Sequence, residues 1–319
     1  MSTTEHTSRI EVDALERRGS VGRRSQRPAG PAQHLAQERE RLAGLQWKRF
    51  GVEMQGSTIG AVLNGIDLAQ VAGDAEAIAE IRAALLEYKV IFFRDQQLNT
   101  EQHVAFAAAF GELEEHPFLQ ASDDDPRLVR FEKSEAAGGY ENIWHSDVSW
   151  REIPSMGSIL RAIEVPAIGG DTLFCDMYAA WEGLDDDTRG QLASLQATHD
   201  ALRAFGAGLS EAESEEQRAK FPTQTHPLMR THPETERQLL YVNRVFTDSI
   251  VGIEPDASES LLSFLCSQAD VPEYQCRFHW EPGSIAFWDN RAVQHYASSD
   301  YWPQRRVMER ATVIGTRPR

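Results

Sequence analysis

Apolar residues follow a helical period in several parts of the chain. Between residues 75 and 88, Ile78, Ile81 and Leu85 recur at intervals of three or four, which predicts a helix over Ala75–Tyr88 with one apolar face. Helices are likewise predicted over three further segments: residues 100–110, with Thr100 as the N-cap and Gly111 as the stop, residues 185–201 and residues 257–268. The helices are therefore spread along the chain between other elements.

Short runs of β-branched and aromatic residues, bounded by turn signals, predict strands. These runs are Trp47–Met54, Val90–Phe93, Asn142–Trp150, Tyr274–Trp280, Ser284–Trp288 and Arg306–Gly315. Many short strands with helices around them favour a mainly β fold with flanking helices (α+β), built as a β-sandwich or jelly roll. The chain lacks GxGxxG, GxxxxGK and GxSxG, so neither a phosphate-cradling loop nor a hydrolase elbow is expected.

The first 45 residues differ from the rest. They contain no aromatic residue, and eight arginines against six acidic residues make them net +2. Too few apolar residues are present to bury a core, so residues 1–45 are predicted to be a disordered N-terminal extension. Within it, Ala32–Leu45 has the composition of a short surface helix. The folded domain is predicted to cover residues 46–319.

Charge and cysteine content exclude some partners. The chain has 319 residues and a net charge of −17, which disfavours nucleic acid and anionic membrane surfaces. Its three cysteines form neither a metal-binding pair nor a disulfide framework. No apolar run is long enough to span a bilayer, and Met1–Glu11 is polar. We therefore expect a cytoplasmic protein that binds neither nucleic acid nor an anionic membrane.

One segment has the pattern of a metal site. In the predicted strand over residues 142–150, His145 and Asp147 are two apart, so their side chains would point to the same face. His295 could add a third ligand from a distant strand. Two histidines and one carboxylate leave three positions of an octahedral ion open, which is typical of non-haem Fe(II) oxygenases. A single HxD motif is weak by itself, and an isolated histidine is more often structural.

Two arginines near the C-terminus add to this picture. On a strand over residues 306–315, Arg306 and Arg310 would share one face. A guanidinium buried on such a face needs an anion, and its geometry matches a carboxylate or a sulfonate. The alternative is a pair of surface arginines that form ion pairs with acids such as Glu309.

Taken together, these motifs resemble the taurine dioxygenase (TauD/TfdA-like) family of Fe(II)/2-oxoglutarate-dependent dioxygenases. The resemblance runs from about Phe50 to Gly315. It is carried by residues 90–94 (VIFFR), 110–113 (FGEL) with 116–117 (HP), 144–147 (WHSD), 169–174 (GGDTLF), 288–291 (WDNR) through His295-Tyr296, and 305–306 (RR) through 310–312 (RAT). It implies a double-stranded β-helix core, also called a jelly roll or cupin-like fold.

The resemblance also implies roles for the cofactor-binding residues. His145, Asp147 and His295 would bind Fe(II), and Arg306 with Thr172 would hold the distal carboxylate of 2-oxoglutarate. With O₂ as the second co-substrate, the enzyme would hydroxylate an unactivated C–H bond and release succinate and CO₂. Two other classes stay open: a non-catalytic jelly-roll binding protein and a zinc hydrolase that uses the same ligands.

Substrate-binding residues follow from the same resemblance. Arg310 would bind an anionic group of the substrate or co-substrate, and His116 matches a substrate-contacting histidine. Phe205 and Phe246 match pocket aromatics, although core packing explains them equally well. A homodimer or homotetramer is also expected.

Three positions depart from the taurine-type pattern. Leu119 replaces a tyrosine, Ala204 replaces a polar residue, and Glu141 stands where an asparagine is expected. Leu119 and Ala204 make the pocket less polar, and an inward-facing Glu141 would oppose a sulfonate. These changes favour a substrate other than taurine: either a small anionic molecule, or the larger and more apolar substrate of a tailoring enzyme for secondary metabolites.

Overall fold

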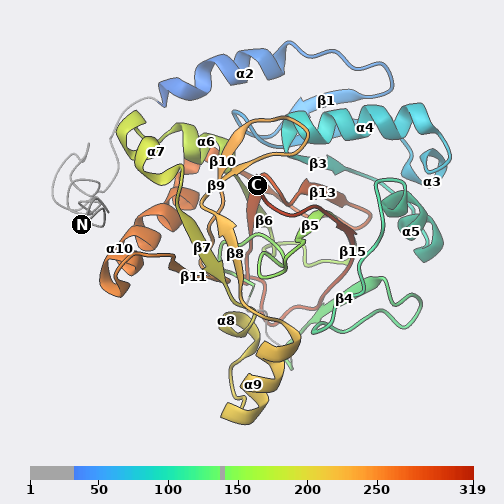
Figure 1. Ribbon diagram of the computed structural model, residues 1–319. Coiled ribbons are helices and arrows are strands. Elements are labelled where there is room, and N and C mark those ends of the chain that lie inside the picture. The colour runs from blue at the N-terminus through green and yellow to red at the C-terminus, as the bar shows by residue number, and fades with distance from the viewer. Residues whose placement is uncertain (1–31, 137–140) are drawn as a thin grey trace, which may run out of the picture.

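A large sheet forms the centre of the fold (Figure 1). The computed structural model describes residues 32–136 and 141–319. The seven strands lie in the order β1 (Gly51–Met54), β2 (Ala61–Asn64), β3 (Val90–Phe93), β13 (Ile285–Asp289), β5 (Ser155–Glu164), β15 (Arg306–Ile314) and β4 (Leu128–Lys133). Neighbouring strands are antiparallel except for β2 and β3, which are parallel.

A second sheet faces the first. Its strands are β12 (Gln275–Phe278), β6 (Thr172–Asp176) and β14 (Val293–Ala297). The two sheets share a buried layer in which the ring of Phe92 on β3 stacks on that of Phe278 on β12, with ring centroids 4.0 Å apart. Two facing sheets, which are antiparallel except for β2 and β3, form the predicted jelly roll, which holds the site between its layers.

Two smaller sheets extend the β structure. One has the order β11 (Thr247–Ile250), β7 (Gln196–His199) and β8 (Gln224–Pro227), and the other pairs β9 (Met229–Thr231) with β10 (Gln238–Leu240).

Helices cover the outside of the large sheet and the smaller sheets. Helix α4 (Ala75–Tyr88) and helix α5 (Thr100–Ala108) pack on the face of the large sheet that points away from the second sheet. The other helical segments are η1 (Gln33–Leu35), α2 (Ala36–Ala43), α3 (Leu68–Val71), α6 (Met177–Glu182), α7 (Asp186–Leu192), α8 (Leu202–Phe205), α9 (Glu211–Lys220), α10 (Pro255–Cys266), η2 (Ser267–Asp270) and η3 (Pro272–Tyr274). Among the described residues, no helix has both the length and the apolar character that a bilayer crossing requires.

The predicted helices agree best with the structure where the segment itself contains a helical period or a capping residue. Helix α4 has the predicted bounds. Helix α5 begins at Thr100, but its N-cap is Asn99, whose side chain accepts a hydrogen bond from the backbone of Gln102 while the Gln102 side chain accepts one from the backbone of Asn99. This reciprocal capping box explains why Asn99 replaces the predicted Thr100.

The predicted helix over residues 185–201 was wrong in its second half. Helix α7 ends at Leu192, and the chain then forms β7, which pairs with β8 and β11. Pairing with strands distant in sequence outweighs the local helical pattern there. The helix predicted over residues 257–268 begins earlier, at Pro255, because proline suits the first turn of a helix.

The structure also changes the picture of the N-terminal extension. Residues 1–31 lie outside the described part of the chain. Residues 32–45 contain the predicted helix as α2, but Leu35 and Leu42 are buried against the domain, so this stretch is not a disordered extension. The folded region therefore begins before the predicted boundary at residue 46.

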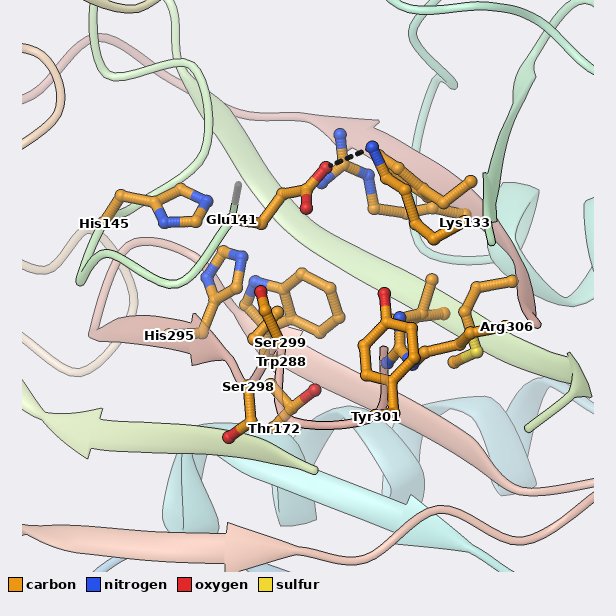
Figure 2. Close-up of a pocket in the computed structure, with 15 residues that line it drawn as sticks. Lys133, Glu141, His145, Thr172, Trp288, His295, Ser298, Ser299, Tyr301 and Arg306 are labelled. Atoms are coloured by element: carbon orange, nitrogen blue, oxygen red, sulfur yellow. Dashed lines mark ion pairs between the residues drawn. The ribbon is translucent and has the colours of Figure 1, made fainter. Parts of the chain in front are cut away.

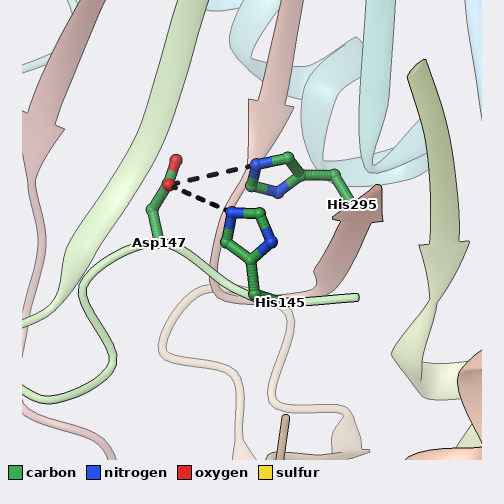
Figure 3. A group of neighbouring side chains, drawn as sticks. All are labelled: His145, Asp147 and His295. Atoms are coloured by element: carbon green, nitrogen blue, oxygen red, sulfur yellow. Dashed lines mark ion pairs between the residues drawn. The ribbon is translucent and has the colours of Figure 1, made fainter. Parts of the chain in front are cut away.

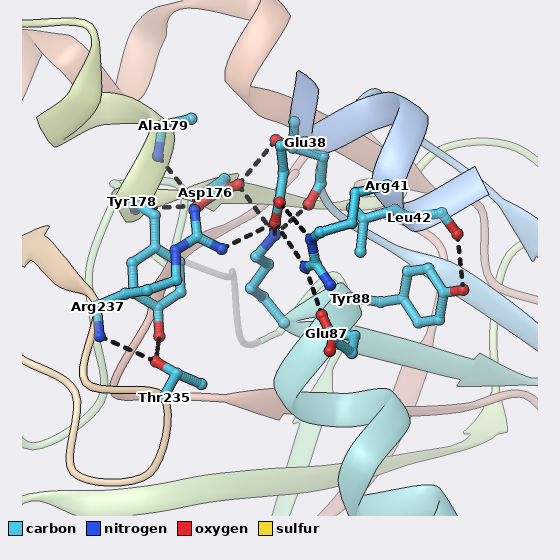
Figure 4. Close-up of polar contacts among 12 residues, drawn as sticks. Glu38, Arg41, Leu42, Glu87, Tyr88, Asp176, Tyr178, Ala179, Thr235 and Arg237 are labelled. Atoms are coloured by element: carbon cyan, nitrogen blue, oxygen red, sulfur yellow. Dashed lines mark hydrogen bonds and ion pairs between the residues drawn. The ribbon is translucent and has the colours of Figure 1, made fainter. Parts of the chain in front are cut away.

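Ion pairs of Glu38 anchor α2 to the jelly roll, and Figure 4 shows Glu38 beside Arg237 and Asp176. Lys89 is 0% exposed; its Nζ donates to the carbonyl of Thr58 at 2.6 Å and lies 3.2 Å from Glu38 on α2 and 3.5 Å from Asp176 on β6. Burial alone would raise the pKa of Glu38. A hydrogen bond from Arg41 and the charges of Lys89 and Arg237 outweigh burial and lower this pKa to about 2.

This anchor leads to a prediction about stability. Glu38→Gln should lower the free energy of unfolding at neutral pH by about 1–3 kcal/mol, because the buried Lys89 loses a charged partner. A lowered carboxyl pKa stabilises the fold above its unfolded value near 4.5, and this contribution disappears as the pH falls toward 2. Urea denaturation at several pH values should therefore show the difference from wild type shrinking below pH 4.5. Glu40→Gln on the exposed face of α2 is the matched control, and an equal loss for both variants would contradict the assignment.

Candidate active site

Three predicted metal ligands come together at one point (Figure 3). Ligand atoms of His145, Asp147 and His295 all lie within 4.8 Å of one another. The Nε2 atom of each histidine is 3.9 Å from Oδ1 of Asp147. Asp147 and His295 are buried, whereas His145 is partly exposed, so the site is open on one side.

The backbone that brings these ligands together is not the predicted strand. Residues 142–150 form an isolated bridge at His145 followed by a turn that begins at Asp147. In the bridge, the backbone N–H of His145 donates to the carbonyl of His295 at 3.1 Å, and that of His295 donates back at 2.8 Å. Val148 in the turn has a φ of 46°, which strands do not adopt. The prediction of a strand was therefore wrong, although the three ligands it suggested do converge.

Hydrogen bonds prepare His145 for metal binding. Its Nδ1–H donates to the carbonyl of Ile143 at 2.7 Å, so Nε2 carries the free lone pair. Burial and the neighbouring His145 lower the pKa of His295 to about 3, which keeps its imidazole neutral. Neutral imidazole is the form that binds a metal.

Asp147 is held as a carboxylate. Nη1 of Arg310 donates to both of its oxygens, at 2.9 and 3.0 Å, and Oγ of Ser158 donates to Oδ2 at 3.1 Å. Burial would raise the pKa of Asp147, but the guanidinium of Arg310, together with the hydrogen bond from Ser158, holds this pKa well below its usual range. A donor set of two imidazoles and one anionic carboxylate fits Fe(II).

A cavity beside the triad contains the predicted co-substrate residues (Figure 2). Thr172, Arg306 and Arg310 line it together with His145 and His295. Arg306 is 7% exposed and has no ion-pair partner among the residues that the structure describes. The two arginines are therefore not the surface pairs of the alternative interpretation, and Glu309 pairs instead with Arg130 and Arg161.

Aromatic rings surround the guanidinium of Arg306. Its Cζ lies 5.9 Å from the ring of Trp280 and 5.8 Å from that of Tyr301. The indole N–H of Trp280 donates to Oγ1 of Thr172 at 3.0 Å, which orients the threonine beside the arginine. A buried cation that has no counter-ion in the described part of the chain, in a cavity that two of the predicted metal ligands also line, is suited to an anionic ligand.

Lys133 was not predicted as a site residue. It lies at the end of β4, directly opposite Arg306 of β15 in the register of the sheet, and it lines the same cavity. Its Nζ forms an ion pair with Oε1 of Glu141 at 3.0 Å (Figure 2). The alternation of apolar and charged residues in Leu128–Lys133 was the available signal for this strand. Glu141 does face the cavity, but Lys133 compensates its charge.

The two aromatic residues predicted to contact the substrate lie outside this cavity. Phe205 and Phe246 belong to an aromatic cluster next to the Asp147 turn, and they do not line the co-substrate cavity. The members of this cluster are Phe118, Val148, Trp150, Ala201, Phe205, Phe221, Val245 and Phe246. Phe118 and Phe221, which the sequence did not single out, contact each other with ring centroids 4.7 Å apart. Phe118 and Phe205 are half-buried, so the cluster is not a closed core.

His116 lies at the edge of this aromatic cluster. Its ring centroid is 6.3 Å from that of Phe205, and its Nδ1 accepts hydrogen bonds from the backbone N–H groups of Phe118 and Leu119. The proton therefore resides on Nε2. Burial lowers the pKa of His116 to about 3, so the ring is a neutral hydrogen-bond donor at physiological pH. Leu119 is half-buried beside it.

Comparison with known proteins agrees with this geometry. The model of the "Taurine catabolism dioxygenase TauD, TfdA family" matches residues 52–312. An alkylsulfatase of Acinetobacter baylyi is 34% identical, over 81% of this chain and 82% of its own. An (S)-phenoxypropionate/alpha-ketoglutarate-dioxygenase of Sphingobium herbicidovorans is 32% identical, over 83% and 95%. A crystal structure described as a putative alpha-ketoglutarate-dependent taurine dioxygenase from Burkholderia xenovorans superimposes with a TM-score of 0.74 at 37% identity, covering 84% of this chain and 94% of that chain. The chain therefore belongs to the TauD/TfdA family and is a 2-oxoglutarate-dependent non-haem iron dioxygenase.

Proposed function

We propose that this dioxygenase binds Fe(II) through His145, Asp147 and His295 and hydroxylates a substrate with one anionic group and an apolar body. The observation that carries the proposal is the buried Arg306, which has no ion-pair partner among residues 32–136 and 141–319 and lies in the cavity that His145 and His295 also line. Bound there, Fe(II) supplies the redox chemistry that couples O₂ to C–H oxidation. Substrate, 2-oxoglutarate and O₂ give hydroxylated substrate, succinate and CO₂.

The co-substrate half of the site depends on Arg306 and Thr172. Arg306 binds the distal carboxylate of 2-oxoglutarate with its guanidinium fork, and Thr172 donates its hydroxyl to the same group. The aromatic rings of Trp280 and Tyr301 exclude water around this contact and so strengthen it. The opposite end of 2-oxoglutarate then points toward the metal ligands, which is the orientation that the reaction needs.

The substrate half depends on His116, Arg310 and the aromatic cluster. Neutral His116 donates from Nε2 to the anionic group of the substrate, and Arg310 adds positive charge next to the metal ligand Asp147. Half-buried Phe118 and Phe205 contact the apolar body. The names of the similar proteins suggest a sulfate ester or an aryloxy acid as such a substrate.

A larger, apolar natural-product intermediate is the second candidate substrate. The half-buried aromatic cluster and the apolar Leu119 beside His116 favour it. Both candidates need the same metal and co-substrate residues, so they differ only in what contacts the cluster. A non-catalytic binding protein and a zinc hydrolase fit less well, because neither accounts for the buried Arg306. The homodimer or homotetramer and the cytoplasmic location remain predictions.

Substrate-dependent succinate release tests the proposed substrate class. A panel of sulfate esters, sulfonates and ether-linked carboxylic acids should be assayed with Fe(II), 2-oxoglutarate and O₂. Each class is represented by a short alkyl compound and an aromatic compound, which for the acids are an alkoxy and an aryloxy acid. We expect the aromatic or long-chain member of a pair to have the higher kcat/KM. Highest activity on a neutral compound that lacks an anionic group would contradict the substrate class without affecting the metal assignment.

The Lys133–Glu141 ion pair gives a prediction about co-substrate binding. Lys133→Met removes a positive charge that compensates the Glu141 carboxylate at the cavity, so this carboxylate repels the two carboxylates of 2-oxoglutarate more strongly. We expect the KM for 2-oxoglutarate to rise roughly tenfold, which corresponds to about 1.4 kcal/mol. Adding Glu141→Gln should restore most of the loss because it removes the negative charge of Glu141 from the cavity. The exposed Lys48→Met is the control, and a double variant as impaired as the single one would contradict this explanation.

A further inference from the structure

Asn290 holds the backbone of the proposed metal ligand Asp147. It lies in the turn between β13 and β14, five residues before His295, and its side chain is fully buried. Its Oδ1 accepts a hydrogen bond from the backbone N–H of Asp147 at 2.7 Å, and its Nδ2 donates to the carbonyl of Asp147 at 2.8 Å. One side-chain amide therefore pairs with both backbone polar groups of a single residue.

The local backbone explains why this contact is needed. Asp147 begins a turn and belongs to no strand, and the next residue, Val148, has a φ of 46°. A β-branched residue rarely adopts positive φ, so contacts around the turn must maintain this conformation. In a strand the N–H and C=O of Asp147 would pair with a neighbouring strand, whereas here Asn290 supplies both partners. Only an amide side chain offers a donor and an acceptor in this arrangement.

Asn290 is itself fixed to the large sheet. Its Nδ2 also donates to Oγ of Ser155 at 2.9 Å, and its backbone N–H donates to the carbonyl of Met156 at 2.9 Å. Both residues belong to β5, the strand that also carries Ser158, which donates to the carboxylate of Asp147. Strand β5 thus positions Asp147 in two ways: it holds the backbone through Asn290, and it holds the carboxylate through Ser158.

The same turn links the two segments that carry ligands. Next to the Asn290 contact, Oγ of Ser146 donates to the carbonyl of Val293 at 2.8 Å, and beyond it lies the bridge between His145 and His295. The contacts of Asn290 with Asp147, of Ser146 with Val293 and of His145 with His295 hold the segment 145–147 alongside the segment 290–295. Of the three, the one made by Asn290 is the one that acts directly on Asp147.

We infer that Asn290 is a positioning residue of the metal centre, which sets the position of Asp147 relative to the two histidines. This inference rests on the proposed metal-binding role of the triad. Groups that orient metal ligands typically contribute 10- to 100-fold to metal affinity. Asn290→Ala should therefore weaken metal binding by that factor even where the protein remains folded.

Titration of the full-length apoprotein with Co(II) tests this inference. The dissociation constant is measured by calorimetry, and the visible absorption of bound Co(II) reports its coordination. We expect Asn290→Ala to raise the dissociation constant about 10- to 100-fold and to change the absorption spectrum. Gln96→Ala is the matched control, because it removes a buried side-chain amide that accepts from the backbone N–H of Leu68 and donates to the carbonyl of Ile66, outside the two ligand segments, and it should stay within about threefold of wild type.

If Asn290→Ala does not fold, the same Co(II) titration is carried out with Asn290→Asp. An aspartate keeps an acceptor for the N–H of Asp147 but loses the donor to its carbonyl, so we expect an affinity loss here as well. Either variant, if folded and binding Co(II) with wild-type affinity and spectrum, would overturn the inference. Failure of the wild-type protein to bind Co(II) would instead refute the proposed metal site itself.

Discussion

Replacing His145 with alanine is expected to reduce substrate-dependent succinate formation by more than about 100-fold. The substitution removes one of three metal ligands, and even groups that only orient a ligand contribute 10- to 100-fold to affinity. His145 is partly exposed and its ring contacts that of His295, with centroids 4.2 Å apart, so its loss should leave the apolar core and the fold intact. Succinate release and O₂ consumption, measured with saturating Fe(II) and 2-oxoglutarate, provide the direct comparison.

The control for this variant is His279→Ala. His279 is a half-exposed histidine that pairs with Asp171 outside the triad. Its replacement should leave turnover near wild type. Full turnover in His145→Ala, with an unchanged melting temperature, would show that the triad does not bind the catalytic metal.

Replacing Arg306 with methionine is expected to raise the dissociation constant of 2-oxoglutarate by about 10²- to 10³-fold. Loss of one partner from a buried, hydrogen-bonded charge pair costs about 2–5 kcal/mol. In the free protein, however, Arg306 has no ion-pair partner among the described residues. Its replacement by an apolar side chain should therefore leave the melting temperature unchanged or higher. Weak ligand binding with undiminished stability is a combination that a purely structural arginine would not produce.

Two variants complete this test. Arg306→Lys should recover only part of the affinity, because an ammonium group lacks the planar fork of the guanidinium. Arg305→Met removes the neighbouring exposed arginine, which pairs with Glu132 and Glu164, and should bind 2-oxoglutarate normally. Normal 2-oxoglutarate binding in Arg306→Met would contradict the assignment of this end of the cavity.

The sequence was sufficient to predict elements that carry their own signals. Helix α4 and strands β3, β13 and β15 lie where local periodicity and composition indicate. On β15, Arg306 and Arg310 both face the cavity, as the two-residue period of a strand requires. The three proposed metal ligands, which the residue types and the family motifs indicated, do lie close together.

Other features depend on contacts that a local pattern does not contain. His145 and Asp147 converge through a turn that Asn290 stabilises from the far end of the chain, so a local interpretation as a strand was wrong. Strand β7 forms only because β8 and β11 flank it. The polar segment around α2 is ordered because Glu38 reaches the buried Lys89.

The net charge illustrates the same distinction. A value of −17 describes the whole surface and argues against polyanionic partners. In the cavity, however, Lys133 is paired with Glu141 and Arg310 with Asp147, so Arg306 is the cation that favours binding of a small anion. The net charge therefore argues against nucleic acid and anionic membranes as partners. The charge of the ligand that the cavity binds follows only from the positions of individual side chains.

The assignment of the metal and co-substrate site is tested most directly by anaerobic titration of the apoprotein with Fe(II) and 2-oxoglutarate. Chelation of Fe(II) by the keto acid in this site should produce a weak charge-transfer absorption in the visible range. We expect this absorption in the wild-type protein and in His279→Ala, but not in His145→Ala. Its absence from the wild-type protein, or its persistence at full intensity in His145→Ala, would contradict the assignment of the triad.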